Sequence, residues 1–194
     1  MALIGWNDGT DKELYTLEEL VAAFDLSRVH KAGAKFDPEK NKWFNHQYLI
    51  KQKDEDLANA FAPIVASKGI TVSANVLIKI VSLIKERAHF VSEFWELSDF
   101  FFVDPIEYDA KATKNWKVET SALMQELISV VEKITDFTSI NIEIIVKTWM
   151  TKNEIGMGKV MQPFRLSLVG APKGPHLFDI VEVIGKEETI QRIQ

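Results

Sequence analysis

The amino-acid sequence predicts a mainly α-helical fold made of short helices with brief connections. Apolar residues recur at the three- and four-residue spacing of amphipathic helices, whereas the alternation typical of strands is nearly absent. Side chains that favour helix starts precede several of these stretches. Of the 194 residues, 46% are hydrophobic, which suffices for a buried core.

Two helix starts are marked in the first third of the chain. Thr16 and Glu19 have the spacing of a capping box, which opens a helix expected to run through Phe24. Asp37 followed by Pro38 predicts a second start, because aspartate caps the first turn and proline fits the first helical position. We expect that helix to place three aromatic side chains in the core: Trp43, Phe44 and Tyr48.

The following helices are indicated by apolar repeats. One repeat, before Gly69, comprises Leu57, Phe61, Ile64 and Val65. The next two comprise Val76, Leu77, Ile80, Val81 and Ile84, and then Leu123, Met124, Leu127, Ile128 and Val131. Ser139 is expected to cap a further helix that carries Ile142, Ile145, Val146 and Trp149.

The C-terminal end combines two short helices with a stiff loop. A helix that carries Arg165 ends at Gly170, and a Pro/Gly loop follows over residues 171–175. A second apolar helix closes at Gly185, before a final turn over residues 187–193. A loop that presents backbone groups beside one planar cation suits an unstacked base better than a small-molecule reaction.

The sequence suggests two boundaries. One lies near Gln52, after the aromatic helix, and the other near Asp109, after an acidic and aromatic stretch. We therefore expect three parts, covering residues 1–52, 53–109 and 110–194. The abrupt start at Met1 resembles the interior of a longer protein.

Charge is unevenly distributed along the chain, although the net charge is only −5. Residues 28–53 hold seven Lys or Arg against two acids, and residues 151–176 hold four against one. Residues 88–110 hold six acids and no Lys or Arg. Two basic segments separated by an acidic one are compatible with ordinary solvated faces, or with an RNA-binding surface backed by an acidic region.

Composition excludes several classes of protein. The chain has no cysteine, so disulfides and thiolate zinc sites are excluded, and a cytoplasmic location is expected. No apolar run approaches the roughly 20 residues of a membrane span. The N-terminus lacks the basic flank and apolar stretch of a signal peptide.

No motif for catalysis is present. The string from Gly156 to Val160 fails as a phosphate-binding loop, because Asn153 stands where the first glycine is needed and Val160 where a Ser or Thr is needed. The four histidines are scattered, so no metal-ligand pair is expected. We therefore expect neither a catalytic residue nor a metal site.

The C-terminal end resembles that of bacterial-type glutamyl-tRNA synthetases. The similarity is carried by Gly156, Gly158, Lys159, Pro163, Arg165, Leu168, Gly170, Gly174, Pro175, Leu177, Phe178, Ile180, Gly185, Lys186, Glu187 and Arg192. Upstream, residues 3–6, 25–37 and 42–48 are similar to further runs of the family, whereas residues 108–150 match less well.

The resemblance implies a particular part of that class I enzyme. The ATP-binding motifs of the family are absent, which places the catalytic domain, with its ATP and Mg²⁺, upstream of residue 1. The three expected parts would then be the tail of a stem-contact region and two consecutive helical anticodon-binding subdomains. The implied partner is glutamate tRNA, bound by a monomer of a glutamate–tRNA ligase.

The resemblance also implies site residues. Arg87 would discriminate the third anticodon letter, and Arg165 would make a second contact to a base or phosphate. Gly174, Pro175, Leu177 and Phe178 would form the loop and helix start around the splayed bases. Lys35, Lys40, Lys42 and Lys159 would contact backbone phosphates, which fix register without reading sequence.

Other interpretations stay open. Arg87, taken alone, would be a surface ion-pair partner of Glu86 or Glu93. The parent could be a non-discriminating synthetase that also charges glutamine tRNA. A helical protein-interaction scaffold, using the acidic face from Glu93 to Asp109, belongs to a different class.

Overall fold

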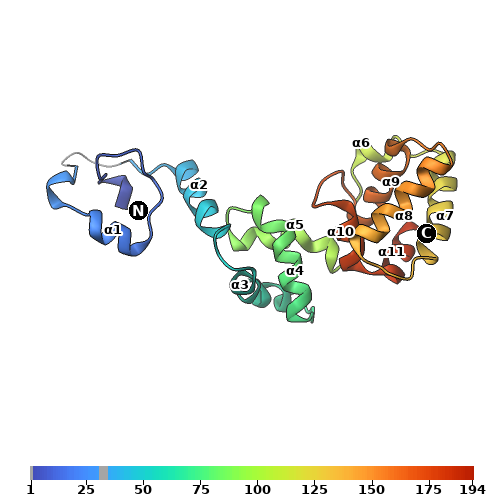
Figure 1. Cartoon of the computed structure of the whole chain (residues 1–194), viewed down its shortest axis with the longest axis horizontal. Helices are drawn as coiled ribbons and strands as arrows, with labels where there is room; N and C mark the ends of the chain where they lie inside the picture. Colours follow the sequence, from blue (N-terminus) through green and yellow to red (C-terminus); the bar gives the residue numbers. More distant parts are fainter. Residues whose placement is uncertain (1, 31–34) are drawn as a thin grey trace. The chain divides into compact units, whose positions relative to one another are not determined.

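The computed structural model describes residues 2–30 and 35–194, and its regular elements in that part of the chain are α-helices and short 3-10 turns (Figure 1). The described residues form no strand, and their only β feature is an isolated bridge between Trp6 and Val29. The prediction of a mainly α fold is therefore confirmed. The chain forms two compact units, Met1–Gln52 and Lys53–Gln194. Residues 31–34, which belong to one of the matched runs, lie outside the described residues.

The first unit contains α1 (Leu17–Ala23) and α2 (Pro38–Leu49), with the short 3-10 turns η1 (Ala2–Ile4) and η2 (Leu26–Arg28). The predicted capping box is present, since the Thr16 hydroxyl accepts from the Glu19 backbone N–H and the Glu19 carboxylate accepts from that of Thr16. The Asp37 carboxylate likewise accepts from two N–H groups of the first turn of α2. Both starts form as predicted because each depends on groups within one helical turn.

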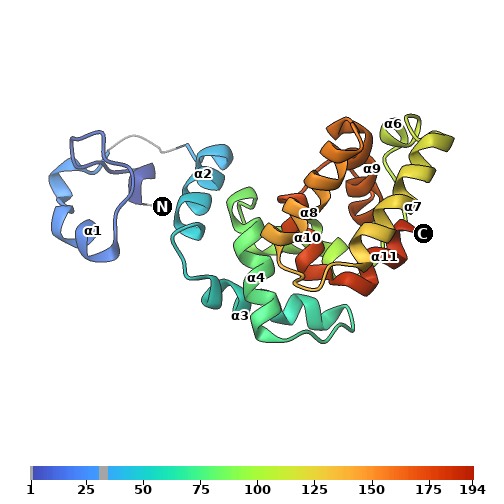
Figure 2. The same cartoon turned by 45° about the vertical axis from the view of Figure 1, so that its right-hand side comes forward.

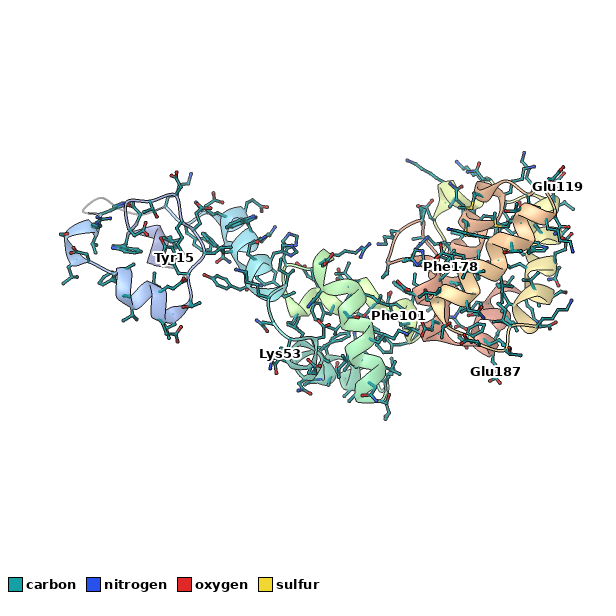
Figure 3. All side chains as sticks on the ribbon, in the orientation of Figure 1. Tyr15, Lys53, Phe101, Glu119, Phe178 and Glu187 are labelled. Atoms are coloured by element: carbon teal, nitrogen blue, oxygen red, sulfur yellow. The ribbon has the colours of Figure 1, made fainter. Side chains whose placement is uncertain are left out.

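The core of the first unit is small. Trp6, Tyr15 and Leu49 are its buried apolar residues, and the Trp6 indole N–H donates to the Asp25 carbonyl at 3.2 Å. The expectation that Trp43 and Tyr48 lie in the core is wrong, because both are more than two-fifths exposed. The Tyr48 hydroxyl nevertheless donates to the Tyr15 carbonyl at 2.8 Å and accepts from the Tyr15 N–H. Tyr15 is labelled in Figure 3.

The second unit starts with a helical hairpin, in which α3 (Asp54–Ser67) packs on α4 (Ala74–Ile84) (Figure 2). The predicted apolar stripes meet there, and Phe61 and Ile84 are fully buried. Arg87 lies at the end of η3 (Lys85–Arg87), directly after α4. The chain then passes through η4 (Val91–Glu93), α5 (Phe94–Ser98) and η5 (Asp99–Phe101).

Six further helices complete this unit: α6 (Ala110–Thr113), α7 (Val118–Glu132), α8 (Ser139–Lys152), α9 (Met157–Val169), α10 (Leu177–Ile184) and α11 (Lys186–Ile193). One apolar cluster joins the helices from α7 to α11 and also includes Phe100 from η5. The prediction that Ser139 caps α8 is wrong, because Thr138 holds the cap position. Ser139 instead bonds across to α10, where its hydroxyl donates to the Asp179 carboxylate and its N–H to that of Glu182. A division of this unit near Asp109 stays a prediction.

Gly170 ends α9 in a conformation that only glycine adopts without strain, with φ of 74°. A Cβ built there would lie 2.5 Å from the Glu107 carbonyl oxygen and 2.9 Å from the Pro105 Cβ. The Gly170 carbonyl also accepts from the Asp109 N–H at 2.7 Å. The backbone before α6 therefore lies directly against the end of α9.

We expect Gly170→Ala to destabilise the protein more than Gly69→Ala does. Gly69 has a similar φ of 77°, but a Cβ at that position would have no atom within 4 Å, so its alanine variant carries only backbone strain, about 1–2 kcal/mol. Overpacking against Glu107 should add about 1–3 kcal/mol for Gly170→Ala. Denaturant unfolding of both variants measures the difference, and equal losses would show that the close approach is not a constraint.

Glu182 makes the stability of the second unit sensitive to acid. A hydrogen bond from Lys79 of α4, at 2.5 Å, and a second from the Ser139 N–H lower the pKa of this carboxyl on α10, although desolvation opposes them. A lowered folded-state pKa gives stability that is present above the unfolded-state pKa and is lost as pH falls through the folded one.

We expect Glu182→Gln to cost about 1 kcal/mol at pH 7, because the amide loses the charge-assisted bonds. The difference from the unsubstituted chain should shrink towards about pH 3, because a glutamate carboxyl ordinarily has a pKa of about 4.3 and the lowered pKa of folded Glu182 lies below it. Urea unfolding at both pH values measures this. Glu126→Gln, at an exposed position on α7 without an ion pair among the described residues, is the control.

Candidate nucleic-acid interface

The loop between α9 and α10 is braced by Arg165. This side chain comes from the middle of α9, and its Nη1 donates to the Pro175 carbonyl at 2.9 Å and to the Lys173 carbonyl at 3.3 Å. Gly174 has a φ of 116° and lies between the arginine and the Phe100 ring. A Cβ at this position would be 3.5 Å from Nη1 of Arg165 and 3.7 Å from the Phe100 ring. The arginine therefore holds the loop in one conformation and lies beside it.

Arg165 is half-buried, and two features of its surroundings lower its pKa. Burial lowers the pKa of its guanidinium, and the positive charge of Arg87 lowers that pKa further. An arginine stays protonated at neutral pH despite such shifts. The charge of Arg87 thus acts on Arg165, although the two residues are 78 positions apart in the sequence.

Arg87 is exposed at the end of η3. Its Nη1 donates to the Leu83 carbonyl at 3.2 Å, near the end of α4. It forms no ion pair with another described residue, so the predicted alternative pairing with Glu86 or Glu93 is absent from the described structure. Most of its five N–H donors therefore face solvent.

The remaining loop residues are mainly structural. Pro175, Leu177 and Phe178 are buried, with Leu177 and Phe178 only 4% and 2% exposed in the C-terminal core (Figure 3). Their side chains are not available to a ligand in this conformation. What this segment offers is backbone, because the first N–H groups of α10 have no partner within the helix.

Sequence reasoning assigned no role to His176, which lies at the N-cap of α10. Its Nε2 is 3.6 Å from the Glu143 carboxylate of α8, and its Nδ1 is 3.7 Å from that of Asp179. The ring is half-exposed beside the loop. The four histidines looked alike in the sequence, and only the fold distinguishes this one.

The predicted phosphate-binding lysines are divided between the two units. Lys35, Lys40 and Lys42 are exposed in the first unit, and Lys159 is exposed on α9 of the second. Lys40 pairs with Glu13 at 2.5 Å and Lys42 with Glu39 at 3.0 Å. Both pairs are at the surface, where such contacts contribute little energy, so either amine is free to exchange its partner for a phosphate.

Two other types of site are absent from the described part of the chain. Within residues 2–30 and 35–194, no group of His, Cys, Asp or Glu is arranged to hold a metal ion. No helix there is long and apolar enough to cross a membrane. A mostly apolar hollow on α8, lined by residues such as Ile144 and Trp149, contains none of the candidate residues.

The arrangement therefore suits an acceptor-rich, anionic ligand. Two arginines supply planar sets of donors, and a rigid loop and a helix start supply backbone donors beside them. Arginine is suited to phosphates and to base edges that present acceptors. Nothing in this set supplies a nucleophile or a general base.

Comparison with known proteins supports the same conclusion. Residues 48–194 match the family described as the anticodon binding domain. The chain is 76% identical over its full length to a glutamate–tRNA ligase of Flavobacterium johnsoniae and 68% identical to that of Flavobacterium psychrophilum, and it covers 39% of each. It thus spans about two-fifths of the length of these relatives.

A solved structure has the same fold. The crystal structure of a glutamate tRNA ligase from Elizabethkingia meningosepticum in complex with its amino acid superposes with a TM-score of 0.93 at 44% identity, over 99% of this chain and 38% of that one. The chain therefore belongs to the anticodon-binding domain family, and it corresponds to the C-terminal anticodon-binding region of glutamate–tRNA ligases.

Proposed function

We propose that this chain binds glutamate tRNA at its anticodon for a glutamate–tRNA ligase. The observation that supports this most is the loop of residues 171–175 braced by Arg165 before the start of α10, in a chain of the anticodon-binding family. The catalytic part of the class I enzyme, which would use ATP and Mg²⁺ to attach glutamate, would be supplied by the rest of the parent protein. We propose that the parent acts as a cytoplasmic monomer.

Arg87 is the proposed discriminator of the third anticodon letter. Glutamate and glutamine anticodons differ there as C against G. Cytosine presents acceptors at O2 and N3 on its pairing edge, whereas guanine presents N–H donors there. A side chain that has only donors favours the first and opposes the second. The solvent-facing guanidinium of Arg87 is free to meet such an edge in a splayed, single-stranded loop.

Arg165 is proposed to contact a neighbouring base or phosphate. Only its Nη1 is used within the described protein, so the other donors of the planar group remain for a ligand. The bonds to the loop carbonyls fix its orientation before binding, which reduces the entropy lost on association. Gly174 and Pro175 would supply backbone contacts, whereas Leu177 and Phe178 would act by holding the loop and the start of α10.

The four lysines are proposed to bind phosphates along the stem and loop. Such contacts release condensed counterions, so binding should weaken steeply as salt rises. A scaffold that docks a protein through an apolar surface should show little salt dependence. Titrating the chain with transcribed glutamate and glutamine tRNAs, at low and moderate salt, therefore tests the proposal. The salt dependence distinguishes it from a protein-docking scaffold, and the comparison of the two tRNAs distinguishes it from a non-discriminating synthetase.

Replacing Arg87 with Gln should weaken glutamate-tRNA binding by about 1–3 kcal/mol and relax the preference for C over G at the third anticodon letter. The amide both donates and accepts, so guanine is no longer opposed. Affinities for the two tRNAs measure this, with the exposed Lys114→Gln as a control for the loss of one charge. An unchanged preference would remove Arg87 from the discriminating role.

Replacing Lys42 with Ala should weaken both tRNAs equally and reduce the slope of log affinity against log salt by about one. Lys12→Ala is the matched control. Lys12 lies in the same unit, is also ion-paired, and has a side-chain exposure of 44% against 46% for Lys42. An equal slope for the parent and the Lys42 variant would exclude the phosphate contact.

A further inference from the structure

Arg192 is the most densely bonded buried cation among the described residues, and it lies outside the proposed contact surface. It projects from α11 with only 4% of its side chain exposed. Its Nη1 donates to the Phe100 carbonyl at 2.6 Å and to the Leu168 carbonyl at 3.0 Å. Its Nε bonds Glu188 at 2.6 Å and lies 2.9 Å from the Asp104 carboxylate.

These partners come from different parts of the second unit. Phe100 and Asp104 lie just beyond α5, which packs on α4 ahead of Arg87, whereas Leu168 is in the last turn of α9, the helix that carries Arg165. The Phe100 ring also lies 3.7 Å from the position of a Cβ on Gly174. One guanidinium is thus bonded to the helix that carries Arg165 and to a segment that is connected, through α5, to the α4 side where Arg87 lies.

Other polar contacts also join this part of the fold, among them the hydrogen bond from the Asp109 N–H to the Gly170 carbonyl at 2.7 Å. The ion pair of Lys79 with Glu182 links α4 to α10, but its side chains are 42% and 26% exposed. Solvent competes with such a pair, whereas it is excluded from Arg192. A planar group with donors fixed in one fork also sets the directions of its partners, which a flexible ammonium does not.

We propose that Arg192 is a positioning residue for anticodon recognition, which fixes the distance between Arg87 and Arg165 by tying the Phe100–Asp104 segment to the end of α9. This inference rests on the proposed function for its consequence in tRNA binding. Its structural part stands independently, because the spacing of the two segments is measurable without RNA.

The absence of cysteine permits a direct test of that spacing. Cysteines introduced at Ser82 on α4 and Gln162 on α9, both exposed, carry spin labels for a pulsed electron-spin distance measurement. We expect a narrow distribution of distances between the labels in the chain with Arg192 intact and a broad one in Arg192→Gln. Glu188→Gln is the matched control, because it removes only the Arg192 partner within α11, and its distribution should stay narrow.

The same variants are then titrated with glutamate tRNA. If only a tenth of Arg192→Gln molecules keep the binding arrangement, apparent affinity falls about tenfold, although neither Arg87 nor Arg165 is altered. Adding Arg87→Gln to this variant should lower the affinity for glutamate tRNA by a smaller factor than it does in the unsubstituted chain. A merely structural role would lower the unfolding temperature but leave the distances, and the affinity of folded molecules, unchanged.

A narrow distribution in folded Arg192→Gln would overturn the proposal. If that variant does not fold, Arg192→Lys replaces it, since it keeps the charge but loses the fork, and an unbroadened distribution there would have the same meaning. Broadened distances with unchanged tRNA affinity would overturn the recognition role. If the unsubstituted chain does not bind tRNA but the distances broaden in the variant, the proposed function is contradicted. The effect of Arg192 on the spacing of the two segments would still be established.

Discussion

The apolar packing beneath the loop of residues 171–175 is the constraint on which the rest of the second unit depends. Phe100, Phe178 and Ile180 belong to one buried cluster, and Gly174 lies directly against it. Interiors of this kind are close-packed, so the loop cannot shift without moving several side chains. Arg165 and its carbonyl partners are set by that packing, and so is the surface available to a ligand.

Most of the residues that carry the family resemblance serve the scaffold. Gly170 is required by a positive φ and by the Glu107 carbonyl close to its Cα, and the Lys186 ammonium donates to the carbonyls of Glu132 and Ile134 at the end of α7. Leu177 and Phe178 are core residues. Most residues of the family pattern therefore hold the fold in place, and only a few of them can contact a ligand. A recognition surface keeps its geometry only if the helices and loops that carry it are rigid.

Local electrostatics matter more here than the net charge of −5. Arg165 is partly desolvated and is exposed to the positive charge of Arg87, and an anionic ligand would offset both effects. The acidic segment from Glu93 to Asp109 contributes differently. Its Asp104 is used internally, against Arg192, so at least part of that segment stabilises the fold rather than binding a partner.

The sequence by itself determined the features whose interactions lie within a helical turn. The capping box of Thr16 and Glu19, the Asp37 start and the Gly170 stop all form as predicted, because their donors and acceptors are a few residues apart. The family resemblance supplied the candidate site, which no spacing rule would have found. Only the tertiary structure decided that Trp43 is exposed, that Ser139 bonds α10 and that Arg192 bonds the Phe100 carbonyl. Such contacts join residues tens of positions apart, and which of them form depends on how whole helices pack rather than on any local pattern.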